Sequence, residues 1–356
     1  MPAATGEHPG PSEAHLKTSD FDYYLPEDLI AQHPLEHRED SRLLVLDRAS
    51  GTRQHRRFAD LPSLLRPDDV LIFNESKVIP ARLRGKKPTG GRAEALLVKP
   101  LDDCSWLALT KPGLRLGQLI VFGDSAHPLC ARVTAIEEDG LRHLKFDRHG
   151  ADLHAAIWGQ GEMPTPPYIH EKLGDPARYQ TVYAREEGSV AAPTAGLHFT
   201  PEILAALQTR GNQLEFITLH VGLGTFQPIK TDEVTAHQMH SEYSQVPADV
   251  AHRLQLARQQ GRRIVAVGTT SVRTLEAAAD ESGDVQPFAG ETRIFIYPGY
   301  RYKAVKALIT NFHLPKSTLL MLVCALAGRD QILDAYAEAV AERYRFFSFG
   351  DAMLIN

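Results

Sequence analysis

The chain has 356 residues, 43% of them hydrophobic, and a formal net charge of −5. This length exceeds the usual size of about 100 to 200 residues for one core, so we expect two domains. The acidic balance excludes a general attraction for nucleic acid, which only a local patch would bind. The three cysteines are scattered and lack CxxC spacing, which excludes a disulfide framework or a zinc–thiolate site and fits a reducing cytoplasm.

The N-terminal segment and the longest apolar run are both informative. Residues 1–18 are rich in Pro, Gly, Ala and Glu and lack the basic start and apolar segment of a signal peptide, so we expect a flexible N-terminal extension. The longest apolar run, 317–328, is shorter than the ~20 residues that cross a bilayer and predicts a buried helix. No membrane partner is therefore expected.

A run of short strands separated by glycines follows the N-terminal part. We expect strands at 93–98, 106–109, 119–122, 130–136 and 141–146, a pattern typical of a small antiparallel barrel or sandwich. A group of basic residues, with no acidic residue between them, lies just before this region and at its start. They are Lys77, Arg82, Arg84, Lys86 and Lys87. They predict a phosphate-binding patch, and a solvated hairpin edge guarded by lysines is the alternative.

Helices and strands alternate after Met163. We expect helices at 201–210, 248–260, 271–280, 317–327 and 331–344, and strands at 214–221, 263–268, 293–297 and 305–310. The alternation is typical of an α/β fold. We therefore predict a larger α/β domain (residues 19–76 and 153–356) with an inserted small antiparallel β-barrel-like domain (residues 77–152). The prolines of 163–169 predict an extended linker between them.

Two glycine loops that each carry a histidine are the strongest functional signal. His198 lies just before a helix for which Thr200 is a plausible N-cap. His220 ends an alternating strand and is followed by Gly222 and Gly224. Such glycines let a ligand approach the backbone, and helix N-termini offer N–H groups and a partial positive charge. The loops predict a compact polar or anionic ligand, although either histidine is alternatively a satisfied structural group.

Two further strand–loop–helix segments repeat this arrangement. Thr269, Thr270 and Arg273 follow an apolar strand, where hydroxyl and N–H groups would bind a carboxylate or ribose hydroxyl; the alternative is a helix cap with a surface salt bridge at Arg273. The segment 310–318 places Asn311 and His313 after another strand, with Ser317 or Thr318 as helix cap. The loops converge only if the strand ends share one edge.

Two weaker patterns remain open. His237, His240 and Glu242 have a loose metal-ligand spacing, but no second cluster joins them, and we expect no metal. Near the C-terminus, arginines alternate with aromatic residues at 343–349. These side chains would stack on bases, or belong to the core, which is slightly favoured.

These segments together resemble the S-adenosylmethionine:tRNA ribosyltransferase-isomerase family of the queuosine pathway. The resemblance spans nearly the whole chain from Ser19, in order. It is carried by Ser19–Pro26, Arg42–Leu44, Phe73–Leu83, Ala192–Phe199, His220–Phe226, Gly268–Arg273, Thr310–Ser317 and Phe349–Asp351. It implies that the ribosyl part of S-adenosylmethionine is transferred to 7-aminomethyl-7-deazaguanine at the tRNA wobble position and isomerised. Adenine and methionine leave, and epoxyqueuosine-tRNA is the product.

The resemblance gives the residues expected roles. A base must remove a C5′ proton beside the sulfonium, and departing adenine must be protonated or hydrogen-bonded, tasks that suit histidine. The candidates for catalysis are His198, His220 and His313, with Glu242 and Asp351 behind them. The candidates for binding S-adenosylmethionine are Gly222, Gly224 and Thr225 around the nucleoside, Thr269, Thr270 and Arg273 at the methionine carboxylate, and Asn311. The candidates for RNA phosphates are Lys77, Arg82, Arg84, Lys86 and Lys87.

The expected partner is a tRNA with a GUN anticodon, bound by a cytoplasmic monomer without a metal. Two competing classes stay open. A non-catalytic tRNA-binding protein would need the basic patch but not the polar loops. A S-adenosylmethionine-dependent tRNA methyltransferase would leave S-adenosylhomocysteine instead of adenine.

Overall fold

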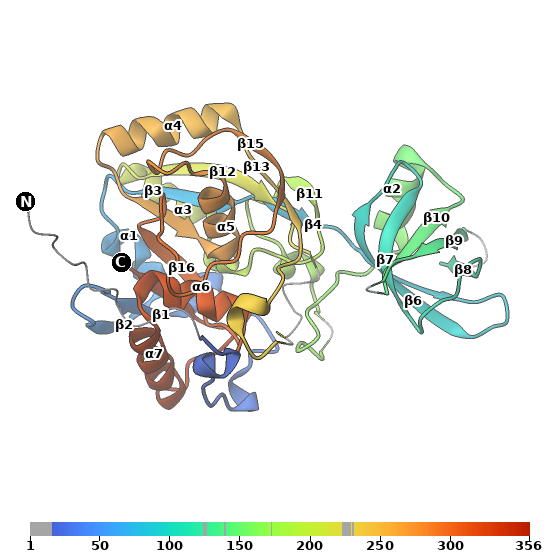
Figure 1. Cartoon of the computed structure of the whole chain (residues 1–356), viewed down its shortest axis with the longest axis horizontal. Coiled ribbons are helices and arrows are strands. Elements are labelled where there is room, and N and C mark those ends of the chain that lie inside the picture. The colour runs from blue at the N-terminus through green and yellow to red at the C-terminus, as the bar shows by residue number, and fades with distance from the viewer. Residues whose placement is uncertain (1–15, 124–126, 139, 172, 223–228, 230) are drawn as a thin grey trace, which may run out of the picture.

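The computed structural model describes residues 16–123, 127–138, 140–171, 173–222, 229 and 231–356, and it has two parts. A large body contains one wide β-sheet with helices on both faces, and a smaller β-barrel projects from it (Figure 1). The chain passes from the body to the barrel after β4 (Ser76–Val78) and returns before β11 (Glu186–Ser189); these two strands pair in parallel. This confirms the predicted α/β fold with a barrel-like second unit.

The sheet of the body has nine strands. In spatial order they are β15 (Phe288–Thr292), β13 (Glu242–Val246), β12 (Gln213–Leu219), β3 (Val70–Asn74), β14 (Ile264–Val267), β16 (Ala307–Asn311), β17 (Ala352–Ile355), β1 (Arg42–Leu46) and β2 (Arg53–Arg57). The four central strands β12, β3, β14 and β16 run parallel to one another. Their carboxyl ends therefore share one edge, where α/β proteins usually bind ligands.

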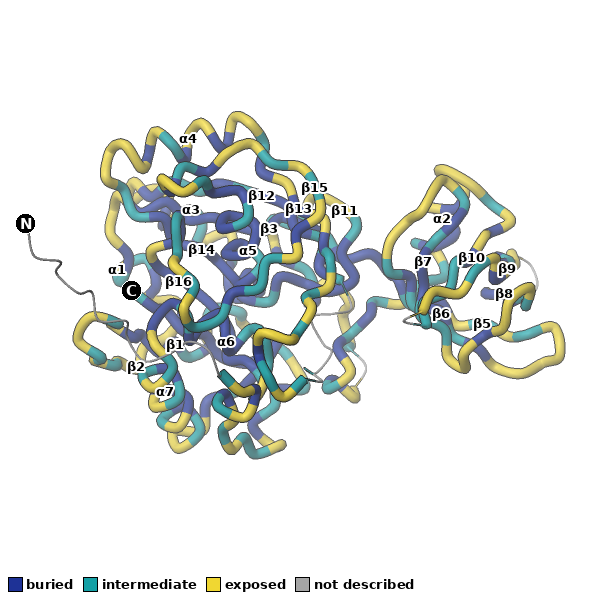
Figure 2. Tube along the Cα trace, in the orientation of Figure 1, coloured by how far each residue is buried: buried dark blue, intermediate teal, exposed yellow. Residues whose placement is uncertain are grey.

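Both faces of the sheet are covered, which explains why its central strands are continuously apolar. The helices α4 (Ala248–Gln259), α5 (Gly268–Ala278), α6 (Thr318–Ala327) and α7 (Arg329–Ala341) cover one face, and α1 (Leu61–Leu64) and α3 (Pro201–Thr209) cover the other. In β3, Val70 and Ile72 belong to the first core, whereas Leu71 and Phe73 belong to the second. This alternation is the two-residue period of a strand, and the buried layer runs through the body in Figure 2.

The barrel is closed by six antiparallel strands. Its order is β10 (Arg142–Phe146), β7 (Ser105–Lys111), β6 (Arg92–Pro100), β5 (Arg82–Lys86), β8 (Leu119–Phe122) and β9 (Leu129–Ile136). Alternate residues such as Leu83, Ala95 and Val133 fill its interior. The helix α2 (Gly150–Gln160) packs against this core through Leu153 and Ile157. Because α2 crosses residue 152, this packing favours a boundary after the helix, not at 152.

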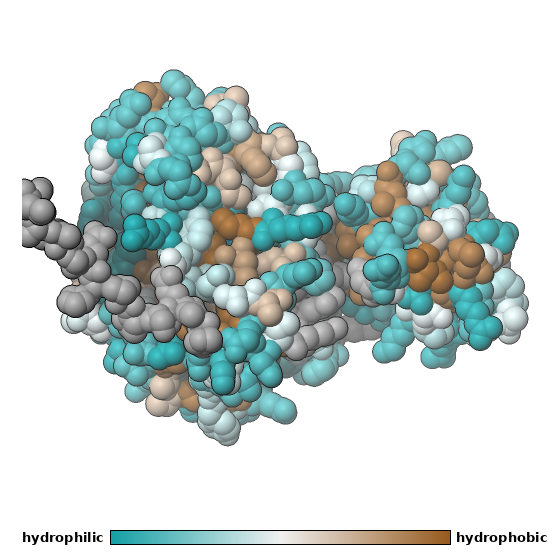
Figure 3. All heavy atoms as spheres, viewed as in Figure 1, coloured by the Kyte–Doolittle hydropathy of each residue, from teal (hydrophilic) through white to brown (hydrophobic). Residues whose placement is uncertain are grey.

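The short 3₁₀ helices connect these elements. They span Thr18–Phe21, Glu27–Leu29, Arg38–Asp40, Phe58–Asp60, Pro176–Tyr179, Thr194–His198 and Val234–Ala236. No helix among the described residues is long and apolar enough to cross a membrane. Apolar and polar residues share the visible surface (Figure 3), and among the described large hydrophobic residues Tyr24 is the most exposed, at 81%.

The structure differs from the predicted elements at several places. The expected strand at 293–297 is wrong, because the strand lies at Phe288–Thr292, where it pairs with β13 as the edge of the sheet. The helix expected at 271–280 already begins at Gly268. The extension expected at 1–18 is wrong for its last residues, since the backbone N of Thr18 donates to the carbonyl of Asp232 at 2.8 Å; residues 1–15 lie outside the described part.

Candidate active site

A pocket opens at the shared carboxyl edge of the central strands. The empty space within it is about 710 Å³, including space open to solvent. The lining residues are Tyr168, Ala191–Ala195, Val221, Gly268–Thr270, Thr310–Leu314, Ser317, Leu319, Phe347 and Ser348. The loops that the sequence predicted to be functional therefore meet there, although the role of each residue stays a prediction.

Two helices begin beside the pocket. Gly268 has φ +85°, a conformation that glycine adopts without strain, and it turns β14 directly into α5. The N-cap position of α5, Val267, has no side-chain cap, so the first N–H groups of this helix remain available to a ligand. Ser317 caps α6 by accepting from Leu320 N, as predicted. Two positive helix ends at one pocket favour a polar or anionic ligand group.

His198 does not line this pocket but lies behind Asn311, in a smaller cavity of about 300 Å³. Its Nδ1 is 2.8 Å from Ser41 Oγ, and its Nε2 is 3.1 Å from Asn311 Nδ2. Burial, together with the charges of Arg38 and Arg345, lowers the pKa of His198 to about 3. A neutral histidine with both nitrogens occupied is poorly suited to remove a proton, so the predicted catalytic role of His198 is not favoured by this geometry.

His313 is the predicted catalytic histidine that the structure places in the pocket. Its Nε2 lies 2.8 Å from Thr310 Oγ1, and burial lowers its pKa to about 3. The imidazole is therefore neutral at physiological pH. It can donate or accept a hydrogen bond to a ligand, but in the free protein it is a weak base.

His220 lies at the end of β12, immediately before the pocket residue Val221. Its ring stacks on Tyr243 with centroids 5.7 Å apart, and burial lowers its pKa. Its Nδ1 is buried without a hydrogen-bond partner. A Cβ at Gly188 would approach the ring to about 2.9 Å, so glycine at this position makes room for the histidine.

A buried charged group lies one turn of α5 beyond the pocket residues Thr269 and Thr270, and neither of its two side chains lines the pocket. Arg273 Nη1 pairs with Glu242 Oε2, and Glu242 Oε1 accepts from Gly222 N at 2.8 Å. The alternative of a surface salt bridge at Arg273 is therefore wrong, because both side chains are buried. Arg273 Nε and Nη2 have no partner. These two donors fit a carboxylate, the group that binds arginine in a bidentate manner.

Asp351, another predicted catalytic residue, lies outside the pocket. Asp351 is buried, which raises its pKa, and its two oxygens accept from the backbone N of Arg42 and of Arg345 at 2.8 Å each. It holds the segment after α7 against β1 and does not line the pocket. Gly224 and Thr225 lie outside the described residues.

The sequence reasoning missed the aromatic wall of the pocket. Tyr168, from the proline-rich linker, stacks on Phe347 with centroids 4.6 Å apart, and its hydroxyl is 2.6 Å from Ser348 Oγ. Phe347 has φ +71°, a strained conformation for a bulky residue that concentrates at functional sites. The aromatic pattern at 343–349 was a sequence signal, but nothing in it indicated this backbone conformation.

The predicted basic patch lies on the barrel and its connection, and much of its charge is paired. Lys77 pairs with Glu187 at 3.1 Å, Arg82 with Glu94 at 3.0 Å, and Arg84 with Glu162 at 2.9 Å. Lys86 and Lys87 form no ion pair with a described residue; they lie at the end of the β5–β6 hairpin. The hairpin alternative thus describes the local structure, and the patch for RNA stays a prediction carried mainly by these two lysines.

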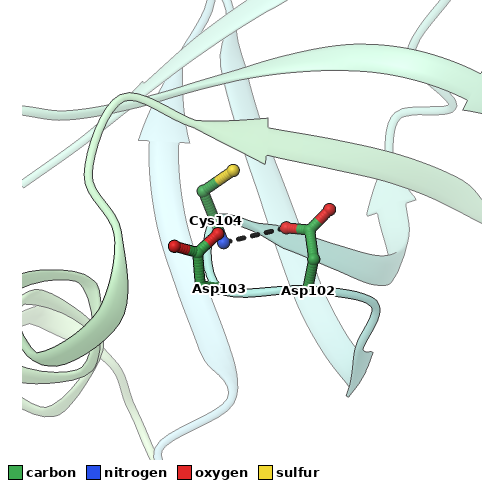
Figure 4. A group of neighbouring side chains, drawn as sticks. All are labelled: Asp102, Asp103 and Cys104. Carbon is green, nitrogen blue, oxygen red and sulfur yellow. Dashed lines mark hydrogen bonds between the residues drawn. The ribbon is translucent and has the colours of Figure 1, made fainter.

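The described residues offer one group of potential metal ligands. Asp102, Asp103 and Cys104 form it on the β6–β7 turn (Figure 4). Asp102 Oδ1 accepts from the backbone N of Cys104 at 2.9 Å and so serves the turn itself. Exposed acidic turns of this kind are common, and the group lies on the barrel. The pattern of His237, His240 and Glu242 does not assemble into such a group.

The fold and the pocket define the class: an α/β protein with a pocket at the carboxyl edge of its sheet and a separate β-barrel. The family profile described as "Queuosine biosynthesis protein" matches residues 18–355. The chain belongs to this family.

Relatives support the assignment over the full length. The S-adenosylmethionine:tRNA ribosyltransferase-isomerase of Symbiobacterium thermophilum is 58% identical over 96% of this chain and its own entire length. The proteins of the same name from Desulfitobacterium hafniense and Natranaerobius thermophilus are 54% and 52% identical, with the same coverage. The crystal structure of S-adenosylmethionine tRNA ribosyltransferase from Thermotoga maritima, 41% identical, covers 95% of this chain and 100% of its own with a TM-score of 0.55.

Proposed function

We propose that this protein is an S-adenosylmethionine:tRNA ribosyltransferase-isomerase. The proposal is supported above all by the pocket at the sheet edge, where two helices have their N-termini. The lining atoms Asn311 Oδ1 and Thr270 Oγ1 have no hydrogen-bond partner and are available to a ligand. The relative that is 58% identical to this chain carries the name of an enzyme that uses S-adenosylmethionine. A pocket with such unpartnered polar atoms has no evident use in a protein that only binds RNA.

The proposed reaction transfers the ribosyl part of S-adenosylmethionine to 7-aminomethyl-7-deazaguanine at the wobble position of a tRNA with a GUN anticodon. The sulfonium makes the C5′ protons acidic, so a base removes one of them. Adenine and methionine leave, and the ribose becomes the epoxycyclopentanediol of epoxyqueuosine. S-adenosylmethionine is a substrate here, and no metal is required for the transfer.

Residues in the pocket and around it would have different roles in this reaction. Arg273, held by Glu242, has two donors that suit the methionine carboxylate, and the N-terminus of α5 adds favourable charge. His313 lines the pocket, and His220 has a ring nitrogen without a partner. These two histidines are the candidates for proton transfer. His198 acts indirectly, because both of its nitrogens are already bonded.

The barrel supplies RNA contacts in this proposal. Lys86 and Lys87 at the tip of the β5–β6 hairpin would contact phosphates of the anticodon arm, and the modified base would leave its stack to enter the pocket. The inserted unit would run from residue 77 to the end of α2. The enzyme would act as a monomer in the cytoplasm.

The test is a product analysis with purified protein, S-adenosylmethionine and an anticodon stem-loop that carries 7-aminomethyl-7-deazaguanine. Free adenine is measured by chromatography and the RNA by mass spectrometry. We expect adenine in equal amount to an RNA that has gained the ribose-derived group. A stem-loop with unmodified guanine is the matched control and should release no adenine.

Other outcomes identify the competing classes. S-adenosylhomocysteine with a methylated RNA would establish a methyltransferase. Tight RNA binding without adenine or a change in RNA mass would establish a binding protein and remove the transferase proposal.

A further inference from the structure

Two polar atoms of the pocket are buried and have no hydrogen-bond partner. They are Asn311 Oδ1, at the end of β16, and Thr270 Oγ1, in the first turn of α5. A buried polar atom without a partner costs roughly 1–3 kcal/mol, so native proteins leave few of them. Both of these atoms line the same pocket, so a single bound ligand is in a position to satisfy them together.

The orientation of the Asn311 amide is fixed by its neighbours. Its Nδ2 donates to the carbonyl of Phe347 at 3.0 Å, and this carbonyl can only accept. The nitrogen must therefore lie on this side of the amide, which leaves Oδ1 as the unpartnered atom. The second proton of Nδ2 points to His198 Nε2, 3.1 Å away.

The hydrogen bonds behind Asn311 then run in one direction. Because Nε2 of His198 accepts, the neutral ring carries its proton on Nδ1 and donates to Ser41 Oγ at 2.8 Å. Ser41 Oγ donates in turn to the carbonyl of Arg38 at 3.2 Å. Every member of this chain is satisfied except Asn311 Oδ1. The ring of His198 is also stacked on Phe58, with centroids 4.9 Å apart, which restrains its position.

The chemistry of the pocket narrows the ligand group. An amide oxygen only accepts, so the ligand must offer an N–H or O–H. The ammonium of methionine is disfavoured because the described lining contains no carboxylate. Apolar and aromatic side chains, including the stacked Tyr168 and Phe347, suit a flat ring instead. Adenine presents an amino donor beside a ring-nitrogen acceptor, which matches an amide oxygen and a hydroxyl that can donate.

We propose that His198 is a positioning residue that holds Asn311 with its amide oxygen toward the pocket, where this oxygen and Thr270 Oγ1 bind the amino edge of the adenine of S-adenosylmethionine. The inference rests on the proposed function and deepens it. It makes Asn311 and Thr270 the residues that select a 6-aminopurine. It also explains why a histidine that cannot act as a base lies directly behind the site.

The test compares equilibrium binding of S-adenosylmethionine and S-inosylmethionine, in which an oxygen acceptor replaces the amino donor. Calorimetry gives both dissociation constants without turnover. We expect the wild-type protein to prefer the amino compound by roughly tenfold or more, the effect of one missing hydrogen bond and a repulsive acceptor pair. Thr270→Val should weaken binding of S-adenosylmethionine several-fold. Thr274→Val, one turn later on α5 with its hydroxyl on the Thr270 carbonyl, is the matched control and should bind as the wild type does.

Variants behind Asn311 test the positioning role. His198→Ala frees the amide to rotate and should reduce the preference for the amino compound to about twofold. His198→Gln supplies an oxygen to accept from Asn311 and an amide to donate to Ser41, so it should restore part of the preference. Ser41→Ala is a milder change that keeps the test open if His198→Ala does not fold, and it should lower the preference partially.

Several results would overturn the inference. Equal binding of both compounds by a wild-type protein that still releases adenine would leave the enzyme function intact and remove the adenine contact. If a 2′- or 3′-deoxyribose analogue of S-adenosylmethionine bound more weakly while S-inosylmethionine bound normally, the ribose, and not adenine, would be the group beside Asn311. If His198→Ala weakened both compounds equally and His198→Gln restored nothing specific, His198 would be structural only. No adenine release by the wild type in the product analysis would instead reject the proposed function.

Discussion

Two arginine–carboxylate pairs with buried carboxylates flank β14, one just before the strand and one in the following helix α5, and they differ in how completely the arginine is satisfied. At the amino end, Arg263 Nε and Nη2 contact the two oxygens of Asp69 at 2.8 and 2.6 Å, and Nη1 contacts Asn356 Oδ1 at 3.1 Å. At the carboxyl end, Arg273 Nη1 contacts Glu242. Its Nε and Nη2 are buried without a partner.

From this difference we predict that the pair at Arg263 is structural and that the pair at Arg273 serves a ligand. The guanidinium of Arg263 uses every nitrogen within the protein, and it joins β14 to the start of β3 and the C-terminus. Arg273 keeps the geometry of a bidentate donor free next to the pocket. Both carboxylates are buried, so the two pairs differ only in whether the arginine is satisfied within the protein, and ligand binding by Arg273 stays a prediction.

Replacing the two arginines should give the largest effects and test the comparison directly. Arg273→Ala and Arg263→Ala each leave a buried carboxylate without its cation, which costs about 3–5 kcal/mol. We expect both variants to lose that much stability in urea denaturation. Only Arg273→Ala should also lose binding of S-adenosylmethionine, measured by calorimetry at a temperature where each variant remains folded.

A double variant separates folding from binding at the pocket end. Arg273→Met with Glu242→Gln removes both charges and should recover much of the stability, because the uncompensated carboxylate is gone. It should still fail to bind S-adenosylmethionine. Normal binding by this double variant would mean that Arg273 is structural, as Arg263 is.

The sequence predicted the position of the pocket better than the chemistry of its residues. Thr269, Asn311 and His313 follow apolar strands, and the parallel order of those strands brings them to one edge. That order depends on long-range pairing, which a local pattern does not contain. The bonding of His198 depends on Ser41, 157 residues away, so its position suggested catalysis until the partners were known.

The misplaced elements have similar causes. The strand expected at 293–297 has an apolar pattern, but the edge position next to β13 is taken by 288–292, whose residues are mostly exposed or half-buried. Neither face of this strand is well covered over its first four residues, so its sequence lacks the apolar alternation that marks a half-buried strand. The strained turn at Phe347 also has no sequence signature. Its purpose is recognised only in the structure, where the carbonyl of Phe347 accepts a hydrogen bond from Asn311.

Two buried neutral histidines lie in or behind the pocket, and they predict that folding stability depends on pH to an intermediate extent. Burial lowers the pKa of His198 and of His313 to about 3, below the ~6.5 of an unfolded histidine. The folded state thus binds fewer protons, so stability is full above about pH 6.5 and falls as the pH decreases. Each histidine should cost about 1.4 kcal/mol for each pH unit below that value.

Urea denaturation between pH 7.5 and 5.5 measures how the free energy of unfolding changes with pH. Most carboxylates titrate below this range, so they contribute little to the slope. His313→Gln should reduce the pH dependence by the share of one histidine. His154→Gln is the control, because His154 is exposed and pairs with Glu187 at 2.7 Å, and it should not reduce the acid loss. An unchanged slope in His313→Gln would show that the pKa of His313 in the folded protein is close to that of an unfolded histidine, and it would reopen the role of His313 as a base.

The smallest effect concerns the predicted basic patch, in which Lys77, Arg82 and Arg84 are already paired with carboxylates. Lys86 and Lys87 are the exceptions within the predicted patch. The double variant Lys86→Ala and Lys87→Ala should weaken binding of the anticodon stem-loop a few-fold at physiological salt. It should reduce the slope of log K against log[salt] by about 0.7 for each phosphate that the lysines no longer neutralise, with binding of S-adenosylmethionine unchanged.

A double variant at Lys99 and Lys145 removes the same charge from other barrel strands, β6 and β10, and is the control. Lys99 already pairs with Glu291 at 3.3 Å, so its removal should change the salt slope less than removal of the hairpin lysines. If the two double variants lowered affinity and slope equally, the barrel would contribute only its overall charge. A loss confined to the hairpin would place phosphate contacts at the one part of the patch whose cations are not satisfied within the protein, by the same reasoning that distinguishes Arg273 from Arg263.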